Sequence, residues 1–269
     1  MASIPMLQME EGRSPQAQTK SGLGIARDNR KPAGFFDNEH MFDDTDAFVQ
    51  GSSVAAAQIA IRMGFLRKVF GILTVQLLIT TVFGAIVVLT PGAKGLVQEW
   101  SWILVVGIIA SFVLLIAMMI YRHESPTNYM LLGAWTFCEA YTVAAVVTFY
   151  DIDVVIESVL LTALVVTGLF IYTMQTTRDY TAWGAGLFSM LLILLVASVL
   201  QMFLMSSAME FIIAIGGAAL FSVFIIVDLQ LLMYKLSPEE YIMATINLYL
   251  DIINLFLHIL RLVAASRRE

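Results

Sequence analysis

Long apolar runs, separated by short polar stretches, dominate the chain after about residue 57. A membrane-spanning helix needs about 20 mostly apolar residues, and seven segments meet that requirement. They are 69–90, 101–121, 128–150, 154–174, 181–205, 211–234 and 241–263. The pattern therefore predicts an all-α polytopic membrane protein with seven transmembrane helices. Small residues in "GAG" at 184–186 and "GGAA" at 216–219 predict that the backbones of neighbouring helices approach closely at these two places.

The segment before these runs has a different character. Residues 1–57 are polar and rich in Gly, Pro, Ser, Asp and Gln, a composition typical of disordered chain. We therefore predict two domains, a disordered cytoplasmic tail at 1–57 and a seven-helix transmembrane domain at 58–269.

The positive charges beside the predicted helices indicate the orientation. On the side of the N-terminus lie Arg62, Arg67, Lys68, Arg122, Arg178 and Lys235. Lys94 is the only Lys or Arg in the predicted loops of the opposite side. Since Lys and Arg gather on the cytoplasmic side of membrane proteins, this asymmetry predicts a cytoplasmic N-terminus.

The end of the chain conflicts with this rule. If all seven helices cross, Arg261, Arg267 and Arg268 lie on the non-cytoplasmic side. Six spans followed by a re-entrant last segment would remove the conflict, whereas segment length favours seven crossings.

Composition supports a membrane protein and excludes several alternatives. Hydrophobic residues make up 59% of the chain and charged residues only 13%, which excludes an ordinary soluble domain. The net charge of −6 argues against nucleic acid as a partner. Cys138 is the only cysteine, so an intramolecular disulfide and a cysteine-based metal cage are both excluded. We expect the lipid bilayer as a partner and no resident cofactor.

A polar stripe runs along the last predicted helix. Asn247, Asp251, Asn254 and His258 follow one another at i, i+4, i+7 and i+11, which places them on one helical face. A charged carboxylate at the centre of a bilayer costs about 2.5–3.5 kcal/mol on insertion scales. We therefore interpret Asp251 as a functional residue.

Asp228 is a second deep carboxylate, on the preceding predicted helix. The short loop "KLSPEE" joins the two helices into an antiparallel hairpin, and each Asp stands about 11 residues, or roughly 17 Å, from its turn. Two acids at equal depth would share one proton and form a pH-sensitive latch. Once ionised, their oxygens suit a hard cation such as calcium. Structural hydrogen bonds to neighbouring helices are the alternative for both residues.

Six further residues are candidates for the pathway or for support of the pair: Glu139, Asn247, Asn254, Arg122, Glu210 and His258. The two asparagines offer amide oxygens as ligands. Glu139 is a further acid for the interior of the bundle, and Glu210 is an acid at a mouth of the pathway. Structural hydrogen bonding remains open for Glu139, and an exposed loop position for Glu210. Arg122 is either a cationic partner of the pair or a solvated helix end. For His258, a hydrogen bond within the bundle is favoured over metal binding.

Several stretches carry a family resemblance. The run "FIIVDLQLLMYKLSPEEYIMATINLYLDIINLFLHILR" at 224–261 resembles the C-terminal signature of the transmembrane Bax inhibitor motif family. "IRMGFLRKVFGILTVQLL", "RHESPTNYMLLGAWTFCEAYTVAAVVTFYD" and "GAGLF" resemble its lifeguard branch, and the likeness covers roughly 61–263.

The resemblance implies a Bax-inhibitor-like fold of seven helices with a central broken or tilted helix. It also implies residence in the Golgi or endoplasmic reticulum, and a pH-regulated calcium leak that lowers luminal stores and suppresses cell death. Asp228 and Asp251 would form the pH sensor and bind Ca²⁺, and the basic partner known on the second helix has Arg122 as its nearest counterpart. Apoptosis regulators or calcium-release channels are the implied protein partners.

Other functions also use paired intramembrane acids. An intramembrane aspartyl protease needs two, but its Gly-x-Gly-Asp element is missing, because Leu248, Tyr249 and Leu250 precede Asp251. We therefore do not predict an enzyme. A proton-coupled transporter and a membrane interaction scaffold regulating apoptosis remain open beside the leak channel.

Overall fold

The computed structural model describes residues 39–90, 92–100 and 102–267, and side chains from residue 57 onward. The chain forms two units, Met1–Gln50 and Gly51–Glu269. Residues 1–38, most of the predicted disordered tail, lie outside the described residues. The remainder of that predicted tail, residues 39–57, is helical and belongs to the first helix.

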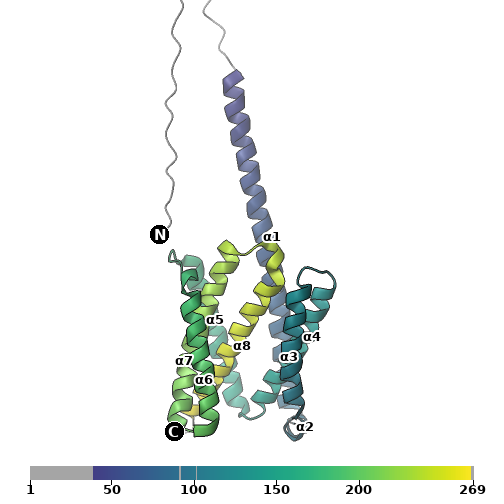
Figure 1. Ribbon diagram of the computed structural model, residues 1–269, viewed down its shortest axis with the longest axis vertical. Helices are drawn as coiled ribbons and strands as arrows, with labels where there is room; N and C mark the ends of the chain where they lie inside the picture. The colour runs from purple at the N-terminus through teal and green to yellow at the C-terminus, as the bar shows by residue number, and fades with distance from the viewer. Residues whose placement is uncertain (1–38, 91, 101, 268–269) are drawn as a thin grey trace, which may run out of the picture. The chain divides into compact units, whose positions relative to one another are not determined.

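The described elements are helical throughout (Figure 1). They are α1 (Glu39–Leu89), α2 (Ala93–Glu99), α3 (Trp102–Tyr121), α4 (Thr127–Val147), α5 (Ile152–Gln175), η1 (Thr181–Trp183), α6 (Gly184–Leu204), α7 (Ser207–Gln230), η2 (Leu231–Lys235), η3 (Pro238–Glu240) and α8 (Tyr241–Ser266). Seven helices are long and apolar enough to cross a membrane, which confirms the predicted number. The short helix α2 was not predicted.

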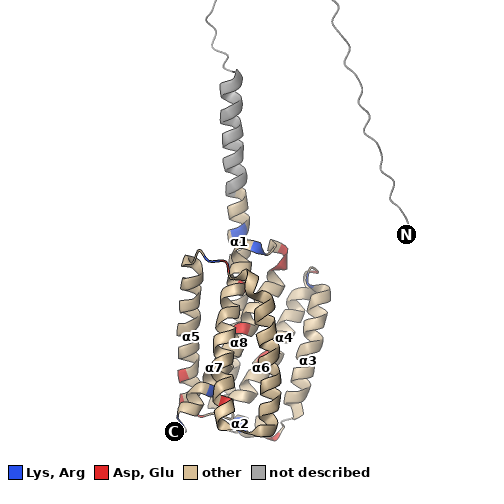
Figure 2. Cartoon of the chain, turned by 60° about the vertical axis from the view of Figure 1, so that its left-hand side comes forward, with Lys and Arg blue, Asp and Glu red and all other residues tan. Residues whose placement is uncertain are grey.

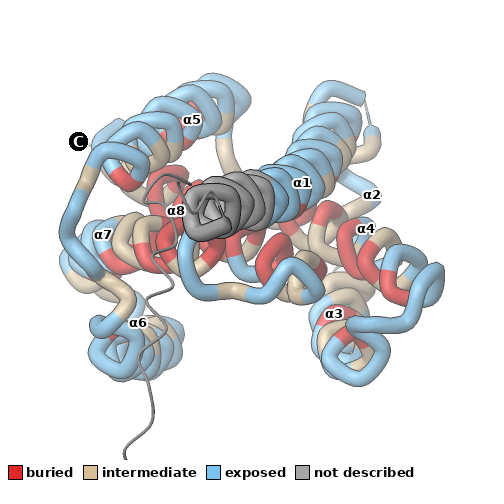
Figure 3. Tube along the Cα trace, turned by 90° about the horizontal axis from the view of Figure 1, so that it is seen from above, coloured by how far each residue is buried: buried red, intermediate tan, exposed pale blue. Residues whose placement is uncertain are grey.

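Helix α8 forms the centre of the bundle. It packs against α7 and α5 and also contacts α4, and Figure 3 shows buried positions gathered along it while the outer faces of α3, α5 and α6 are exposed. Large apolar side chains cover those outer faces, as expected where helices meet lipid. Charged residues gather near the two ends of the bundle, with few at mid-height (Figure 2).

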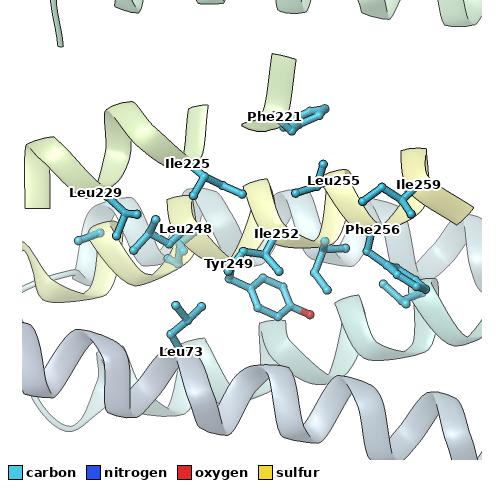
Figure 4. Packing of buried hydrophobic residues seen from close by; sticks show 14 of the residues in the cluster. Leu73, Phe221, Ile225, Leu229, Leu248, Tyr249, Ile252, Leu255, Phe256 and Ile259 are labelled. Carbon is cyan, nitrogen blue, oxygen red and sulfur yellow. The ribbon is translucent and has the colours of Figure 1, made fainter. Parts of the chain in front are cut away.

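Two buried contacts fix α8 against α1 and α4. The Tyr249 hydroxyl lies 2.7 Å from that of Thr80 on α1, and the Tyr249 ring makes an edge contact with Trp135 on α4, with centroids 5.3 Å apart. Figure 4 shows the Tyr249 ring on the side of α8 that faces Leu73, and the α7 side chains Ile225 and Leu229 on the opposite side of α8. Aromatic pairs of this geometry contribute about 0.5–1.5 kcal/mol beyond their burial.

Helix α8 is unbroken and long enough to span a bilayer. Its 26 residues correspond to a length of roughly 39 Å at 1.5 Å per residue, against about 30 Å for the hydrocarbon core. Figure 1 shows it tilted and running through the height of the bundle. The structure therefore has a continuous, tilted central helix where the resemblance allowed a broken one, and it lacks the re-entrant turn considered for this segment.

Candidate functional site

The carboxyl groups of Asp228 and Asp251 meet at the interface of α7 and α8. They lie within reach of a side-chain hydrogen bond to one another. Asp251 is buried, with 7% of its surface exposed, and Asp228 is partly buried. In this antiparallel hairpin, two residues that are equally far from the turn lie at the same height. Asp228 and Asp251 are such a pair, so they lie at equal depth, as predicted.

A second contact shows that this register holds further along the helices. His258, seven residues after Asp251, stacks on Phe221, seven residues before Asp228, with ring centroids 5.6 Å apart. Two turns of antiparallel helix therefore separate the acidic pair from an aromatic pair in the same interface.

Apolar side chains surround the acids. Ile225 on α7 and Leu248 on α8 are fully buried, and Leu255 is 1% exposed. In such surroundings two adjacent carboxylates cannot both be ionised without a large electrostatic penalty, whereas one proton lets them share a hydrogen bond. Among the described residues, the buried Oδ2 atom of Asp251 has no hydrogen-bond partner.

The two asparagines of the predicted stripe do not support the pair. Asn247 is exposed. The Nδ2 of Asn254 donates to the backbone oxygen of Leu250 at 2.8 Å, a local bond within α8. Because α8 is surrounded by several helices, residues of one helical face do not share one environment.

Glu139 and Arg122 also lie away from the pair. Glu139 on α4 faces Ser111 of α3. Arg122 is exposed in the loop between α3 and α4, where its backbone oxygen accepts a hydrogen bond from Asn128 Nδ2 at 3.1 Å. The structure therefore brings neither the additional acid nor the expected cationic partner to the pair.

His258 occupies a notch in α7. A Cβ built on Gly217 would lie only 2.2 Å from Cε1 of the His258 ring, so the close approach requires glycine at this position. Of the glycines in the two small-residue stretches, only Gly217 has a close neighbour, and that neighbour is a side chain rather than a backbone. Nothing lies within 4 Å of a Cβ built on Gly184, Gly186 or Gly216, so the close approach expected at "GAG" is not found. Among the described residues no three His, Cys, Asp or Glu side chains gather as a metal site. The hydrogen bond expected for His258 is not found either, because its buried Nδ1 has no partner in the described part of the chain.

Glu210 lies in the first turn of α7 and lines a cavity of about 630 Å³. Arg261 of α8 lines the same cavity. The sequence alone suggests Glu210 as an acid at a mouth of the pathway. The structure adds Arg261 to the wall of the same cavity.

Arg62 of α1 is a structural residue that sequence reasoning missed. Its Nε donates to the backbone oxygen of Met233 at 2.8 Å, and its Nη1 donates to that of Leu236 at 2.7 Å. Met233 belongs to the π-helical turn that continues α7, and Leu236 is the residue that follows this turn. The end of the helix leaves carbonyls without regular helical partners, and a guanidinium satisfies two of them.

Gln230 fixes the same end of α7 from another direction. It is 3% exposed. Its Nε2 donates to the Arg178 backbone oxygen at 2.7 Å, and its Oε1 accepts from the Tyr180 amide at 2.8 Å. Arg62 and Gln230 therefore hold the segment that carries Asp228 against α1 and the loop after α5.

Comparisons with known proteins show the family of the chain. The family described as inhibitor of apoptosis-promoting Bax1 matches residues 62–268. Protein lifeguard 4 of Mus musculus is 46% identical over 224 residues, covering 83% of this chain and 94% of that protein. The Golgi anti-apoptotic protein of Vaccinia virus (strain Lister) is 43% identical with the same coverage. Bax inhibitor 1 of Schizosaccharomyces pombe is 34% identical over 219 residues, which cover 81% of this chain and 82% of that protein.

The family match runs from within α1 to the end of α8, a range that contains positions 228 and 251. The lifeguard and viral relatives identify the branch that the sequence motifs suggested. This integral membrane protein therefore belongs to the Bax1 inhibitor family.

Proposed function

We propose that the protein is a pH-sensitive calcium leak channel of intracellular membranes, gated by Asp228 and Asp251, which lowers luminal calcium and suppresses cell death. The observation that carries this proposal is the meeting of two carboxyl groups inside the apolar interface of α7 and α8. The name of the family and that of the viral relative support the anti-apoptotic part.

The protonation state of the pair sets the gate. With one proton, the two carboxyls share a hydrogen bond that holds α7 against α8. Loss of that proton places two negative charges side by side, which repel each other and favour a cation between them. Opening and cation binding therefore both follow from deprotonation, and the sign of the effect is higher flux at higher pH.

The pair fits a transported ion better than a resident one. Calcium takes six to eight oxygen ligands in a stable protein site, whereas no described cluster offers three or more acidic, His or Cys side chains. Conduction requires binding weak enough for the ion to leave. Calcium and protons are thus the cargo and the regulator, and no bound cofactor is needed.

The relatives and the charges of the chain support the proposed location. One relative is named as a Golgi protein, and we assign this chain to the Golgi or endoplasmic reticulum. The ends of helices on the N-terminal side carry more Lys and Arg, including Arg62, Arg178 and Lys235, and this asymmetry supports a cytoplasmic N-terminus.

Calcium flux through the full chain in liposomes, measured between pH 6 and 8, tests the proposal. We expect flux to rise with pH in the wild type and to lose this dependence in Asp228→Asn and Asp251→Asn. Asp153→Asn is the matched control, because that acid is exposed in the first turn of α5. Absence of wild-type flux at every pH would refute the leak. A pH dependence that both pair variants retain would refute the gate.

A proton-coupled transporter is the second candidate, because the same buried pair can carry a proton across. A pH-sensitive dye enclosed in the same liposomes separates the two functions. Proton movement opposite to calcium and proportional to it favours the transporter, whereas calcium flux that proceeds without it favours the leak.

A further inference from the structure

A cavity of about 630 Å³ lies where α6 ends, α7 begins and α8 approaches its last turns. Its wall contains two charged side chains, Glu210 and Arg261, among mainly apolar ones. This volume is in the range of small-molecule sites, which likewise combine apolar walls with a few polar groups.

The two charges of the cavity are available to a ligand. Among the described residues, neither Arg261 nor Glu210 forms a salt bridge, although they line the same space. The cavity also contains Gln201, whose Oε1 is buried without a hydrogen-bond partner while its Nε2 donates to the Ser206 backbone oxygen at 2.8 Å. A guanidinium presents planar donors that suit phosphate oxygens, and a carboxylate attracts an ammonium group.

The position of the cavity suits a lipid. Helix α6 ends at Leu204 and α7 begins at Ser207, so the charged part of the wall lies close to the ends of membrane-spanning segments, where headgroups lie. Tyr150 at the α4–α5 connection adds an aromatic side chain of the kind enriched at membrane interfaces. Leu195 and Val199 line the same cavity further inside α6 and offer apolar contact for acyl chains.

We propose that this cavity binds a zwitterionic phospholipid, with the phosphate on Arg261, the ammonium beside Glu210 and the first acyl carbons against α6. The opposite charges of the wall match the opposite charges of such a headgroup. In a lipid with a phosphate but no ammonium, the Glu210 carboxylate would repel the phosphate, and no positive group of the lipid would offset that repulsion. The site is separate from the acidic pair and does not depend on calcium conduction.

Native mass spectrometry of the full chain in detergent, titrated with phosphatidylethanolamine or phosphatidylglycerol of identical acyl chains, tests this site. We expect the wild type to prefer phosphatidylethanolamine. Arg261→Gln should weaken binding of both lipids by about tenfold or more, since a charge-assisted phosphate contact is lost. Glu210→Gln should remove the preference by strengthening phosphatidylglycerol binding.

Arg267→Gln is the matched control, because this arginine pairs with Glu157 at 2.6 Å outside the cavity. It should leave the binding of both lipids unchanged. Arg261→Lys retains the charge but not the planar donors, so it should bind both lipids several-fold more weakly than the wild type. This variant tests the phosphate contact in case Arg261→Gln does not fold.

Wild-type lipid affinity in both Arg261 variants would overturn the phosphate contact. The ammonium contact would be overturned if Glu210→Gln still preferred phosphatidylethanolamine. It would also be overturned if the wild-type protein preferred phosphatidylglycerol. Free phosphoethanolamine should not displace the lipid at equal concentration, because it lacks the acyl chains. Displacement under that condition would assign the cavity to a soluble headgroup compound and overturn the lipid.

Discussion

The His258 ring stacks on Phe221 with ring planes inclined by 24°, and it lies directly against Gly217 of α7. The imidazole fills the space that any larger residue at 217 would need. Glycine is thus required here by the close approach of a neighbouring ring, since its own backbone is ordinary α-helix. This contact sets how closely α7 and α8 pack two turns from the acidic pair.

Gly217→Ala should lower the stability of the bundle. The new Cβ would clash with the buried ring, and overpacking of this kind costs about 1–3 kcal/mol. Thermal unfolding in detergent measures the change. Gly216→Ala is the matched control, because nothing lies within 4 Å of a Cβ at that position, and alanine favours a helix over glycine. Adding His258→Ala to Gly217→Ala should recover part of the loss. A Gly217→Ala melting temperature equal to that of Gly216→Ala would contradict this account.

The equal depth of the two acids could be predicted because it depends on local facts alone. A short loop and a fixed rise per residue determine which positions of a helical hairpin lie opposite each other. The pairing of Asp228 with Asp251 is a result of this kind, whereas the small residues of "GAG" at 184–186 do not mark a close neighbour. Likewise, apolar run length was enough to give seven spanning helices.

The partners of Arg62 could not be predicted in this way. Its two carbonyl acceptors are 171 and 174 residues away in the sequence, and they lie in and just after the π turn that ends α7. Helical periodicity also misassigned Asn247, since it defines a face but not what covers that face. Long-range packing decides both features.

Arg62→Ala should destabilise the end of α7. It removes two hydrogen bonds from a charged donor, and such bonds contribute about 1.5–3 kcal/mol each when partly buried. Arg62→Lys should recover less than half of the loss, because an ammonium cannot reach both carbonyls with planar geometry. Hydrogen exchange at 229–236 should rise in both variants. Arg67→Ala, at an exposed position of the same helix, should leave exchange unchanged, and an equal rise there would point to a general effect on α1.

The loop after α5 should show an acid-dependent contact. Hydrogen bonds from the Thr181 hydroxyl, the Thr181 amide and Lys235 hold the pKa of Asp179 below its ordinary value. Because the folded-state pKa is lowered, this stabilisation is complete above the ordinary Asp value of about 4 and is lost as pH falls through the lowered pKa.

Hydrogen-exchange protection of the Thr181 amide, corrected for intrinsic rates, measures this contact. Protection should be constant from pH 8 to 5 and should fall in stronger acid, whereas Asp179→Asn should start lower and respond less to acid. Asp151→Asn, at another exposed loop acid, should behave as the wild type. Loss of protection near neutral pH would contradict the assigned sign.

The buried hydroxyls of Thr80 and Tyr249 should differ in what their removal costs. The Thr80 hydroxyl donates its proton to the Gln76 backbone oxygen at 2.9 Å, so Tyr249 must be the donor in the 2.7 Å contact between the two hydroxyls. Tyr249→Phe leaves Thr80 with a partner and keeps the ring against Trp135. It should therefore cost about 0.5–1.5 kcal/mol.

Thr80→Val is the more harmful change, because it leaves the tyrosine proton buried without an acceptor, at a cost of about 1–3 kcal/mol. In the double variant no unpaired donor remains, so the total loss should be smaller than the sum of the two single losses. Thermal unfolding in detergent of the four proteins measures the cycle. Additive losses, or a larger effect of Tyr249→Phe than of Thr80→Val, would show that the hydroxyls do not act as the donor and acceptor assigned to them.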